Sequence, residues 1–402
     1  MWRMKEQLKE TRKGYRRGQM WFFLGRNIIG IPFKILYNFR GKRYNIREQP
    51  FLLVANHTDN MDPAYELASI NKYVRFVVSD HLTRKASLRI LLKVLAAPII
   101  YHREKGSDAL YEEIVRNLHA GINVGVFIEG SKSNNGETGY ISKRNAEMIK
   151  DGNCGLITYR NIGGYMKCPR WADNKRKGRS FGHIVNIYSR EELQKMSVDE
   201  IYDRLLQDMY FNAYDEQRKN PRKYIAENPA ESAEIMLYVC PKCKAIGSLK
   251  SKGDKISCSC GFCANIDDYG FWHSDDMEFD DIVRWDNFQK SVLKELTDSK
   301  KGTNELLFSD EKQIVYTLDE KGNRVLQGEN AVLRQFADRI ELSYKEENVK
   351  LPIDKINSIK IAAKMNLLIV LDNVYYEIHS EIPRSAIKYV VATRYLLGKE
   401  NK

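Results

Sequence analysis

Several features that would define other protein classes are missing from this sequence. It has no low-complexity tract, no internal repeat and only two cysteines outside one short segment. Its longest apolar stretch, residues 20–39, is interrupted by Arg26 and Lys34, whereas a membrane-spanning helix needs about 20 mostly apolar residues. The first 19 residues are too charged for a cleavable signal, and no small-residue cleavage site follows them. These absences argue against a disordered chain, a spanning helix and a secreted disulfide scaffold.

The composition is instead that of a folded protein with an uneven charge. The 402 residues are 43% hydrophobic and 29% charged, which allows two or three domains. Residues 1–50 contain 13 Lys and Arg against 3 Glu, so most of the net charge of +12 lies there. A basic segment of this kind favours an anionic partner, such as a lipid surface or nucleic acid.

We expect residues 1–45 to form a basic amphipathic helical arm that lies in a membrane interface without crossing it. The apolar side of this arm would consist of Trp21, Phe22, Phe23, Ile28, Ile29 and Phe33. The alternative is an amphipathic helix that packs on the protein's own core. The first interpretation predicts a peripheral or monotopic protein on an anionic membrane surface, at the cytoplasmic face of the membrane.

Residues 50–190 alternate between short apolar runs and helical patterns. The runs predicted as strands are 51–57, 74–80, 97–103, 124–130, 154–160 and 183–189, and the predicted helices are 86–96, 108–121 and 141–152. Such alternation predicts an α/β fold with a mostly parallel sheet flanked by helices. A single long helix over residues 197–221 closes this domain, which we place at residues 46–222.

A histidine and an aspartate follow the first predicted strand at an interval of five residues. The segment "VANHTDNMDP" (54–63) places His57 directly after an apolar run. On one ideal helix, side chains five residues apart point about 140° away from each other. The pair can interact if His57 precedes a helix and Asp62 lies in its first turn. Asp62 would then fix the tautomer and leave the other ring nitrogen as a general base, although a lone histidine is more often structural.

Polar residues also follow two other predicted strands, in the segments "VFIEGSKS" (126–133) and "PIIYHREKG" (98–106). The residues concerned are Arg103, Glu129, Gly130, Ser131 and Lys132. Gly130 allows a ligand to approach the backbone, and hydroxyls with Lys132 suit a phosphate. Without further support they are also compatible with an ordinary turn and a surface arginine. Active sites in parallel sheets collect at the carboxyl ends of strands, where all three segments lie.

Together these segments resemble the glycerolipid acyltransferases, the family that includes the 1-acyl-glycerol-3-phosphate (lysophosphatidic acid) acyltransferases. The stretches "NHTDNMD", "IIYHR" and "FIEGSKS" have the order and the separations of the first three blocks of that family. The matching positions are Asn56, His57, Asp62, Arg103, Phe127, Glu129, Gly130 and Ser133. Residues 155–171 occupy the place of the fourth block, so the resemblance covers about residues 20–215.

The resemblance implies acyl transfer from a thioester donor, acyl-CoA or acyl carrier protein, to the hydroxyl of a lysophospholipid acceptor. His57 would be the general base and Asp62 its orienting residue, without a covalent nucleophile. In agreement, the sequence contains no G-x-S-x-G motif. Arg103, Glu129 and Gly130 would hold the glycerol phosphate of the acceptor.

Two positions depart from the family and leave the acceptor open. Lys132 replaces a common arginine and loses bidentate phosphate binding, and Asp59 replaces a frequent serine. The product expected from 1-acyl-glycerol-3-phosphate is phosphatidic acid. Glycerol-3-phosphate and another lysophospholipid remain alternative acceptors.

Five of the seven cysteines lie between residues 240 and 263, in "CPKC" and "CSCGFC". Two tight turns with four thiolates suit a tetrahedral, structural Zn²⁺, and such spacing indicates metal ligands in a reducing compartment. We predict a zinc ribbon at residues 235–270. Its ligands would be Cys240, Cys243, Cys258 and Cys260, and the alternative second pair is Cys260 with Cys263.

The last hundred residues contain short strand patterns followed by a helix. The predicted strands are 304–309, 312–318, 338–344, 356–362, 366–372 and 374–380, and the helix is 383–397. This order predicts a small β-rich barrel or sandwich at residues 300–402. In element order it resembles pleckstrin-homology and GRAM-type domains.

A second class of function is a non-catalytic zinc-ribbon module whose basic arm binds nucleic acid. The acidic run after the cysteines, residues 265–282, disfavours a phosphate-binding face on the ribbon. A module that only binds nucleic acid would also not require His57, Asp62, Arg103 and Glu129 together. The sequence therefore favours a lipid acceptor over nucleic acid.

Overall fold

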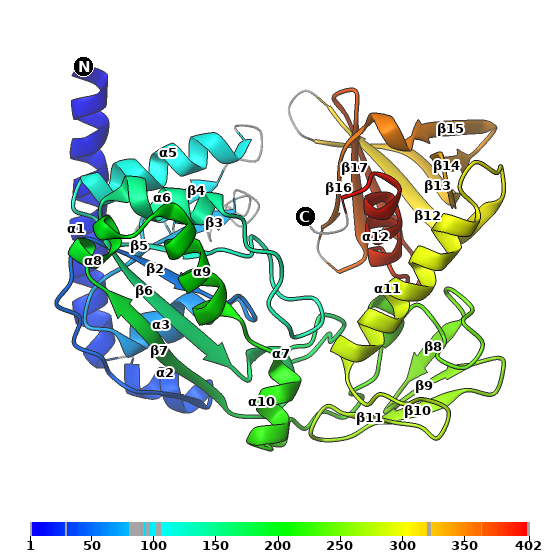
Figure 1. Cartoon of the computed structure of the whole chain (residues 1–402), viewed down its shortest axis with the longest axis horizontal. Coiled ribbons are helices and arrows are strands. Elements are labelled where there is room, and N and C mark those ends of the chain that lie inside the picture. The colour runs from blue at the N-terminus through cyan, green and yellow to red at the C-terminus, as the bar shows by residue number, and fades with distance from the viewer. Residues whose placement is uncertain are drawn as a thin grey trace. The chain divides into compact units, whose positions relative to one another are not determined.

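The computed structural model describes residues 2–28, 30–79, 90, 92, 96–101, 106–319, 323–362 and 364–399. They belong to two compact units, shown in Figure 1. Unit 1 contains Met1–Lys167 and Gly178–Arg222, and unit 2 contains Cys168–Lys177 and Lys223–Lys402. The chain therefore passes between the units three times, a feature that the sequence did not indicate.

Unit 1 is built around one seven-stranded, mostly parallel sheet (Figure 1). Its strands are β1 (Phe39–Gly41), β2 (Phe51–Ala55), β3 (Arg75–Ser79), β4 (Ile99–Tyr101), β5 (Val124–Phe127), β6 (Gly155–Ile162) and β7 (Ser180–Tyr188). Their order is β1-β7-β6-β2-β5-β3-β4, and the neighbours β6 and β7 are antiparallel whereas the other pairs are parallel. The predicted α/β fold class is confirmed, and each of the six predicted strands is present.

Apolar side chains cover both faces of this sheet, which explains the continuous apolar runs of its strands. The helices after the N-terminal pair are α3 (Asp62–Ser69), α5 (Gly106–His119), α6 (Arg144–Gly152), α7 (Gly164–Lys167), α8 (Arg190–Lys195), α9 (Val198–Met209) and α10 (Ala213–Lys219). In β2, Leu52 and Val54 enter a core shared with α5, α6 and α9. The alternate residues Phe51, Leu53 and Ala55 enter a second core on the other face. The predicted helix 86–96 lies largely outside the described residues.

The single helix predicted over residues 197–221 is wrong, because two helices occupy this segment. Asn212 caps α10, since its Oδ1 accepts the N–H of Tyr214 at 2.9 Å. Between α9 and α10, the Phe211 N–H donates to Thr138 Oγ1 at 2.9 Å, and the Thr138 N–H donates to the Phe211 carbonyl at 2.9 Å. These bonds to a distant loop replace helical ones, and a local sequence pattern cannot reveal them.

The N-terminal segment forms α1 (Trp2–Ile28) and α2 (Gly30–Leu36). Of the six side chains expected on the apolar outer side, Ile29 lies outside the described residues, and two others turn toward the protein instead. Phe22 packs against Tyr73, with ring centroids 6.0 Å apart, and Phe33 packs against Tyr65 at 5.7 Å. The exposed apolar side chains are Met20, Trp21, Phe23, Leu24, Ile28, Ile35 and Leu36. Among the described residues, no helix combines the length and the apolar character needed to cross a membrane.

The described residues of unit 2 form two antiparallel sheets and two α-helices. The small sheet has the order β11-β10-β9-β8, and its strands are β8 (Leu249–Lys252), β9 (Lys255–Cys258), β10 (Cys263–Ile266) and β11 (Trp272–His273). The large sheet contains β12 (Leu306–Leu318), β13 (Arg324–Phe336), β14 (Arg339–Tyr344), β15 (Glu347–Pro352), β16 (Ile356–Ala362), β17 (Asn366–Leu371) and β18 (Val374–Ser380). The helices are α11 (Ile282–Ser299) and α12 (Ile387–Leu396), and short 3-10 turns lie at Ala233–Ile235 and Ile353–Lys355.

The large sheet of unit 2 confirms the predicted β-rich region with a terminal helix and changes its details. Its order is β15-β14-β13-β12-β18-β17-β16. The runs 304–309 and 312–318 join into one strand, β12, whose pairing with β13 has register shifts. Neither β13 nor β15 was predicted, because their polar and apolar residues do not form the continuous apolar runs that other strands show. The helix α11 was not predicted either.

Candidate active site and cysteine cluster

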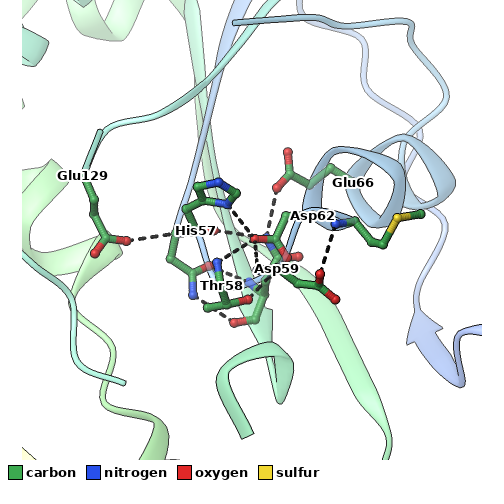
Figure 2. A network of polar contacts seen from close by, with 9 residues as sticks. His57, Thr58, Asp59, Asp62, Glu66 and Glu129 are labelled. Atoms are coloured by element: carbon green, nitrogen blue, oxygen red, sulfur yellow. Dashed lines mark hydrogen bonds and ion pairs between the residues drawn. The ribbon is translucent and has the colours of Figure 1, made fainter. Parts of the chain in front are cut away.

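The carboxyl ends of β2 and β5 lie side by side and bring His57 next to Glu129. The two strands are parallel neighbours, and Ala55 pairs with Phe127 at their ends. His57 and Glu129 each follow two residues after this pair. The His57 N–H donates to Glu129 Oε1 at 3.3 Å, and Glu129 approaches His57 from the side opposite Asp62 (Figure 2). Parallel register thus gathers two distant segments at one edge of the sheet.

The imidazole of His57 is held on one face and at one nitrogen. It stacks on the Phe127 ring, with centroids 4.3 Å apart and 18° between the ring planes. Its Nδ1 lies 3.0 Å from Asp62 Oδ2. Within the described part of the chain, no group hydrogen-bonds to Nε2, and the side chain is 22% exposed. With Nδ1–H donating to the carboxylate, Nε2 carries a lone pair that can accept a proton.

The carboxylate of Asp62 is completely buried, and several donors satisfy it. Besides His57, its Oδ2 accepts the N–H groups of Thr58 at 2.6 Å and Asp59 at 2.9 Å. Its Oδ1 accepts the Thr58 hydroxyl at 3.3 Å (Figure 2). Asp62 is the first residue of α3 and Pro63 follows it, so the helix dipole also favours the carboxylate at this place. These donors replace the water that burial removes.

Glu129 connects the tip of β2 to the loop after β5. Its Oε1 accepts the His57 N–H, and its Oε2 accepts the Gly139 N–H at 2.8 Å. Burial raises the pKa of this carboxyl, and the hydrogen bonds from Gly139 and His57 together with the His57 charge oppose the rise. Because backbone donors engage both oxygens, the Glu129 side chain fixes the loop 130–139 against the strand that carries His57.

The loop after β5 carries three further predicted residues, Gly130, Ser131 and Lys132. Gly130 has φ +70° and open space at its Cβ position, so the left-handed backbone itself favours glycine there. Ser131 is exposed and Lys132 is half-buried. The Ser133 N–H donates to the His57 carbonyl at 3.0 Å, which holds this loop beside the histidine.

Glu66 and Asn161 extend the site, although the sequence did not indicate them. Asn161, at the end of β6, donates from Nδ2 to Glu66 Oε1 at 3.0 Å and to the Asn56 carbonyl at 3.2 Å. A second bond joins the same pair, because Asn56 Oδ1 accepts the Asn161 N–H at 2.7 Å. Complete burial raises the pKa of Glu66 well above its ordinary value. The other predicted residue, Arg103, lies outside the described residues.

A separate cluster of four cysteines forms in unit 2. The Sγ atoms of Cys240, Cys243, Cys258 and Cys260 all lie within 4.8 Å of one another. Two tight turns present them. The Lys244 N–H donates to the Cys240 carbonyl at 2.9 Å, and the Gly261 N–H donates to the Cys258 carbonyl at 3.1 Å. The group does not include Cys263, which is exposed at the start of β10. Four thiolates at these separations suit a tetrahedral metal ion such as Zn²⁺.

Comparison with solved structures returns partial similarities of low identity. The chain is similar to the 1-acyl-sn-glycerophosphate (LPA) acyltransferase PlsC from Thermotoga maritima, with 20% identity and a TM-score of 0.35, over 51% of this chain and 80% of that chain. It is also similar to Inner Membrane Complex Sub-compartment Protein 3 (ISP3) from Toxoplasma gondii, with 15% identity and a TM-score of 0.19, over 27% and 88%. The N-terminal PH domain of human ARAP2 matches with 12% identity and a TM-score of 0.18, over 23% and 77%.

A family model matches the part of the chain that contains the histidine. No curated protein matches this chain. Residues 37–159 match the family model described as Acyltransferase, and this range includes β2, α3 and β5. His57, Asp62 and Glu129 all lie within it. Residues 37–159 of this chain are therefore similar to the acyltransferase family.

Proposed function

We propose that this protein transfers a fatty acyl chain from a thioester donor to the free hydroxyl of 1-acyl-glycerol-3-phosphate, which gives phosphatidic acid. The observation that carries the proposal is the contact of His57 Nδ1 with the buried carboxylate of Asp62, at 3.0 Å. This contact fixes one tautomer and leaves Nε2 as the base. The match to the acyltransferase family model supports the reaction class.

The proposed reaction needs one base and no covalent enzyme intermediate. His57 Nε2 takes the proton of the acceptor hydroxyl while the hydroxyl oxygen attacks the thioester carbonyl. The carbon–sulfur bond then breaks, the thiolate leaves, and the imidazolium returns the proton to it. Asp62 stabilises the imidazolium while the positive charge is present, since its carboxylate lies against Nδ1.

The loop after β5 is the proposed binding place for the phosphate of the acceptor. It offers the hydroxyl of Ser131, the ammonium of Lys132 and the open backbone at Gly130. Glu129 contributes by holding this loop, because its two oxygens accept backbone N–H groups. Arg103 is the further cation that the family resemblance assigns to the same phosphate. A cation that donates a hydrogen bond to phosphate is a strong partner.

We propose that α1 and α2 place the domain on an anionic membrane at its cytoplasmic face. Large apolar side chains on these helices are exposed, with Ile28 at 73%, Ile35 at 75% and Leu36 at 78%. The same segment carries most of the net positive charge of the chain. Apolar insertion combined with attraction to anionic lipid is the usual basis of interfacial binding.

The cysteine cluster is the proposed site of one structural Zn²⁺. Cys240, Cys243, Cys258 and Cys260 would hold the ion, and its role would be to stabilise the two turns that carry them. A closed set of four thiolates leaves no open coordination position for chemistry. We therefore assign the ion no part in acyl transfer.

A test of the reaction uses purified protein with labelled acyl-CoA or acyl carrier protein and three acceptors. These are 1-acyl-glycerol-3-phosphate, glycerol-3-phosphate and a neutral lysophospholipid. Labelled phosphatidic acid from the first acceptor is expected. Product from another acceptor would retain the chemistry and change the substrate, whereas no product from any donor and acceptor would contradict the proposal.

The phosphate site is tested with Lys132→Ala in the same assay. The KM for 1-acyl-glycerol-3-phosphate should rise about tenfold, since a charge-assisted hydrogen bond is lost. The KM for a neutral acceptor, if one is used, should change little. An equal rise for both acceptors would show that Lys132 supports the fold and does not bind phosphate.

The membrane proposal is tested by flotation with liposomes. Replacing Ile28, Ile35 and Leu36 by serine should release the protein from anionic vesicles, because apolar area is lost at the interface. Replacing Ile187, Ile225 and Val325 by serine is the control, since these are exposed elsewhere in the two units. Equal binding of both variants would contradict the assignment to α1 and α2.

A further inference from the structure

Two carboxyl groups on α3 are buried within one helical turn of each other. Asp62 and Glu66 lie four residues apart, and both residues are 0% exposed (Figure 2). Two carboxyl groups that share a buried site cannot both be ionised without a large cost in free energy. The surroundings of the two groups therefore decide which of them carries the negative charge.

The surroundings of Asp62 favour the ionised form. Its carboxylate accepts the N–H groups of Thr58 and Asp59 and the hydroxyl of Thr58, and His57 Nδ1 lies 3.0 Å from it. Asp62 is also the first residue of α3, where the helix dipole is positive. Hydrogen bonds to the charged form keep a carboxylate ionised even where water is excluded.

The surroundings of Glu66 favour the neutral acid. Among the described residues, Glu66 receives one hydrogen bond, from Asn161 Nδ2 to Oε1 at 3.0 Å. Burial raises the pKa of Glu66 and the Asp62 charge adds to the rise, whereas the bond from Asn161 opposes it. The other titratable group coupled to Glu66 is the phenol of Tyr159 on β6, which donates to Ser69 Oγ at 2.8 Å. Neither neighbour supplies a positive charge.

Two unpartnered oxygen atoms lie on the bonded pair of Glu66 and Asn161. Within the described part of the chain, Glu66 Oε2 and Asn161 Oδ1 are both buried without a hydrogen-bond partner. The Asn161 amide has one orientation, because its Nδ2 donates to two acceptors, the Asn56 carbonyl and Glu66 Oε1. Its Oδ1 can therefore only accept, and an ionised Glu66 could only accept as well. A proton on Glu66 Oε2 would supply the donor that this pair of side chains lacks.

Asn161 also holds the residue that precedes His57. The pairing of β2 with β6 ends at Ala55 and Tyr159. Beyond this point the Asn161 N–H donates to Asn56 Oδ1 at 2.7 Å, and Asn56 Nδ2 donates to the Asn161 carbonyl at 2.9 Å. Together with the bond from Nδ2 to the Asn56 carbonyl, they join two buried residues. Because His57 follows Asn56 directly, these bonds fix the backbone from which the imidazole extends.

We propose that Glu66 is a neutral carboxylic acid in the folded protein and that it positions His57 through Asn161 and Asn56. Its proton completes the hydrogen bonding of the Asn161 amide, and the amide holds the tip of β2. Glu66 and Asn161 are positioning residues, since they act through Asn56 and not on the substrate. The effect on catalysis rests on the proposed function, whereas the protonation of Glu66 does not depend on it.

A neutral Glu66 also limits the charge that is buried around the base. The site then contains one negative charge, on Asp62, which the imidazolium formed during transfer neutralises. A second carboxylate one turn further along α3 would hold a proton on the imidazole before the acceptor arrives, and Nε2 could not act as a base. The competing explanation is an ionised Glu66 whose Oε2 is solvated by a buried water.

The protonation of Glu66 is tested by infrared difference spectroscopy on the full-length protein at neutral pH. The spectrum of Glu66→Gln is subtracted from that of the wild type, so that the bands of Glu66 remain. A protonated carboxyl group gives a C=O band that a carboxylate lacks, and this band is expected. Glu147→Gln is the matched control, because Glu147 is an exposed glutamate on α6 and should give carboxylate bands. Carboxylate bands from Glu66 would overturn the proposal.

The positioning role is tested by amide hydrogen exchange in the peptide that covers residues 56–62. In Glu66→Ala and Asn161→Ala this peptide should exchange about tenfold faster, because the bonds that hold the tip of β2 are weakened. Glu66→Gln should keep the protection, since its amide can both donate to Asn161 Oδ1 and accept from Nδ2. The control is Asn186→Ala, because Asn186 lies on β7 and donates to Asp208 Oδ1 at 2.7 Å.

Two results of the exchange experiment would contradict the positioning role. One is unchanged exchange of the peptide in both Glu66→Ala and Asn161→Ala. The other is equal acceleration in Asn186→Ala, because the effect would then be a general loss of stability in the sheet. Neither result depends on whether the protein transfers acyl groups.

Kinetics extend the test to the proposed reaction. If the wild type transfers acyl groups, kcat should fall about tenfold in Glu66→Ala and Asn161→Ala, because the base is displaced. The KM for the acceptor should change little, and Glu66→Gln should restore kcat. An equal loss of kcat in Glu66→Gln and Glu66→Ala would overturn the catalytic part. If the wild type is inactive with every acceptor, the proposed function fails, while the infrared and exchange data still decide the role of Glu66.

Discussion

Two polar clusters in this chain are assembled in opposite ways. The cluster around His57 brings together residues from the ends of β2, β5 and β6, which are separated by up to 105 positions in the sequence. The cysteine cluster comes from two local turns, the first at residues 240–244 and the second at residues 258–261. One cluster depends on a sheet with two hydrophobic cores, and the other lies in a small region with few strands.

The two clusters are therefore expected to tolerate different kinds of damage. Around His57, the scaffold holds the backbone whether or not the imidazole is present, so a functional side chain can be removed without unfolding. Around the cysteines, four thiols face one another, and the proposed metal supplies the attraction that holds them. Function and stability should therefore separate in the first cluster and coincide in the second.

The largest effect is expected from His57→Ala. The rate of acyl transfer should fall about 10²–10⁴-fold, which is the usual contribution of a general base. The thermal unfolding of the protein should stay close to that of the wild type, because the backbone N–H and carbonyl of His57, which bond Glu129 and Ser133, remain in the variant. His119→Ala is the matched control, since His119 is an exposed histidine on α5. Retained transfer in His57→Ala, or unfolding of this variant, would contradict the separation of function from stability in this cluster.

In the cysteine cluster, Cys243→Ser should remove both zinc and local structure. Metal analysis of the purified variant should show loss of most of the zinc, and limited proteolysis should cut between residues 238 and 273. Cys263→Ser is the control, because Cys263 lies outside the group of four. Zinc loss in Cys263→Ser with retention in Cys243→Ser would show that the other pair of cysteines is used.

A smaller effect, dependent on pH, is expected from Glu66→Gln. The raised pKa means that the folded protein keeps the Glu66 proton at pH values where the unfolded chain has released it. The free energy of unfolding of the wild type therefore decreases as the pH rises above the ordinary glutamate pKa. The decrease is about 1.4 kcal/mol per pH unit over the range in which only the folded state holds the proton. Glutamine is neutral throughout and lacks this loss.

The measurement is urea unfolding of both proteins from pH 5 to pH 8. The variant should gain stability relative to the wild type as the pH increases. A parallel pH dependence of the two proteins would mean that Glu66 does not hold a proton at neutral pH. Glu66 would then be an ionised member of the cluster around His57.

Part of this fold followed from local patterns. The strands of unit 1 were predictable because both faces of the sheet are covered, which makes each strand a continuous apolar run such as "FLLVA" in β2. The strand β13 was missed because its outward residues are polar, as in "RVLQGENAVLRQF". The break between α9 and α10 was missed because it depends on Thr138, which lies far away in the sequence.

The candidate site likewise contains residues that local patterns predict and residues that they do not. The spacing of His57 and Asp62 is local, and a strand followed by a helix places them within reach of each other. Glu66 carries no local signal, because its burial depends on the end of β6, where Asn161 meets it. The apolar run alone likewise could not show whether the side chains of Phe22 and Phe33 point toward the protein or toward the solvent.

The sequence by itself determined the α/β class, the polar residues at strand ends and the two cysteine turns, because each depends on residues close together in the chain. Only the tertiary structure decided which strands are neighbours, and hence that His57 meets Glu129 and that Asn56 meets Asn161. It also decided that residues 168–177 belong to unit 2. Burial and long-range hydrogen bonds depend on how distant segments pack, and no local pattern records that packing.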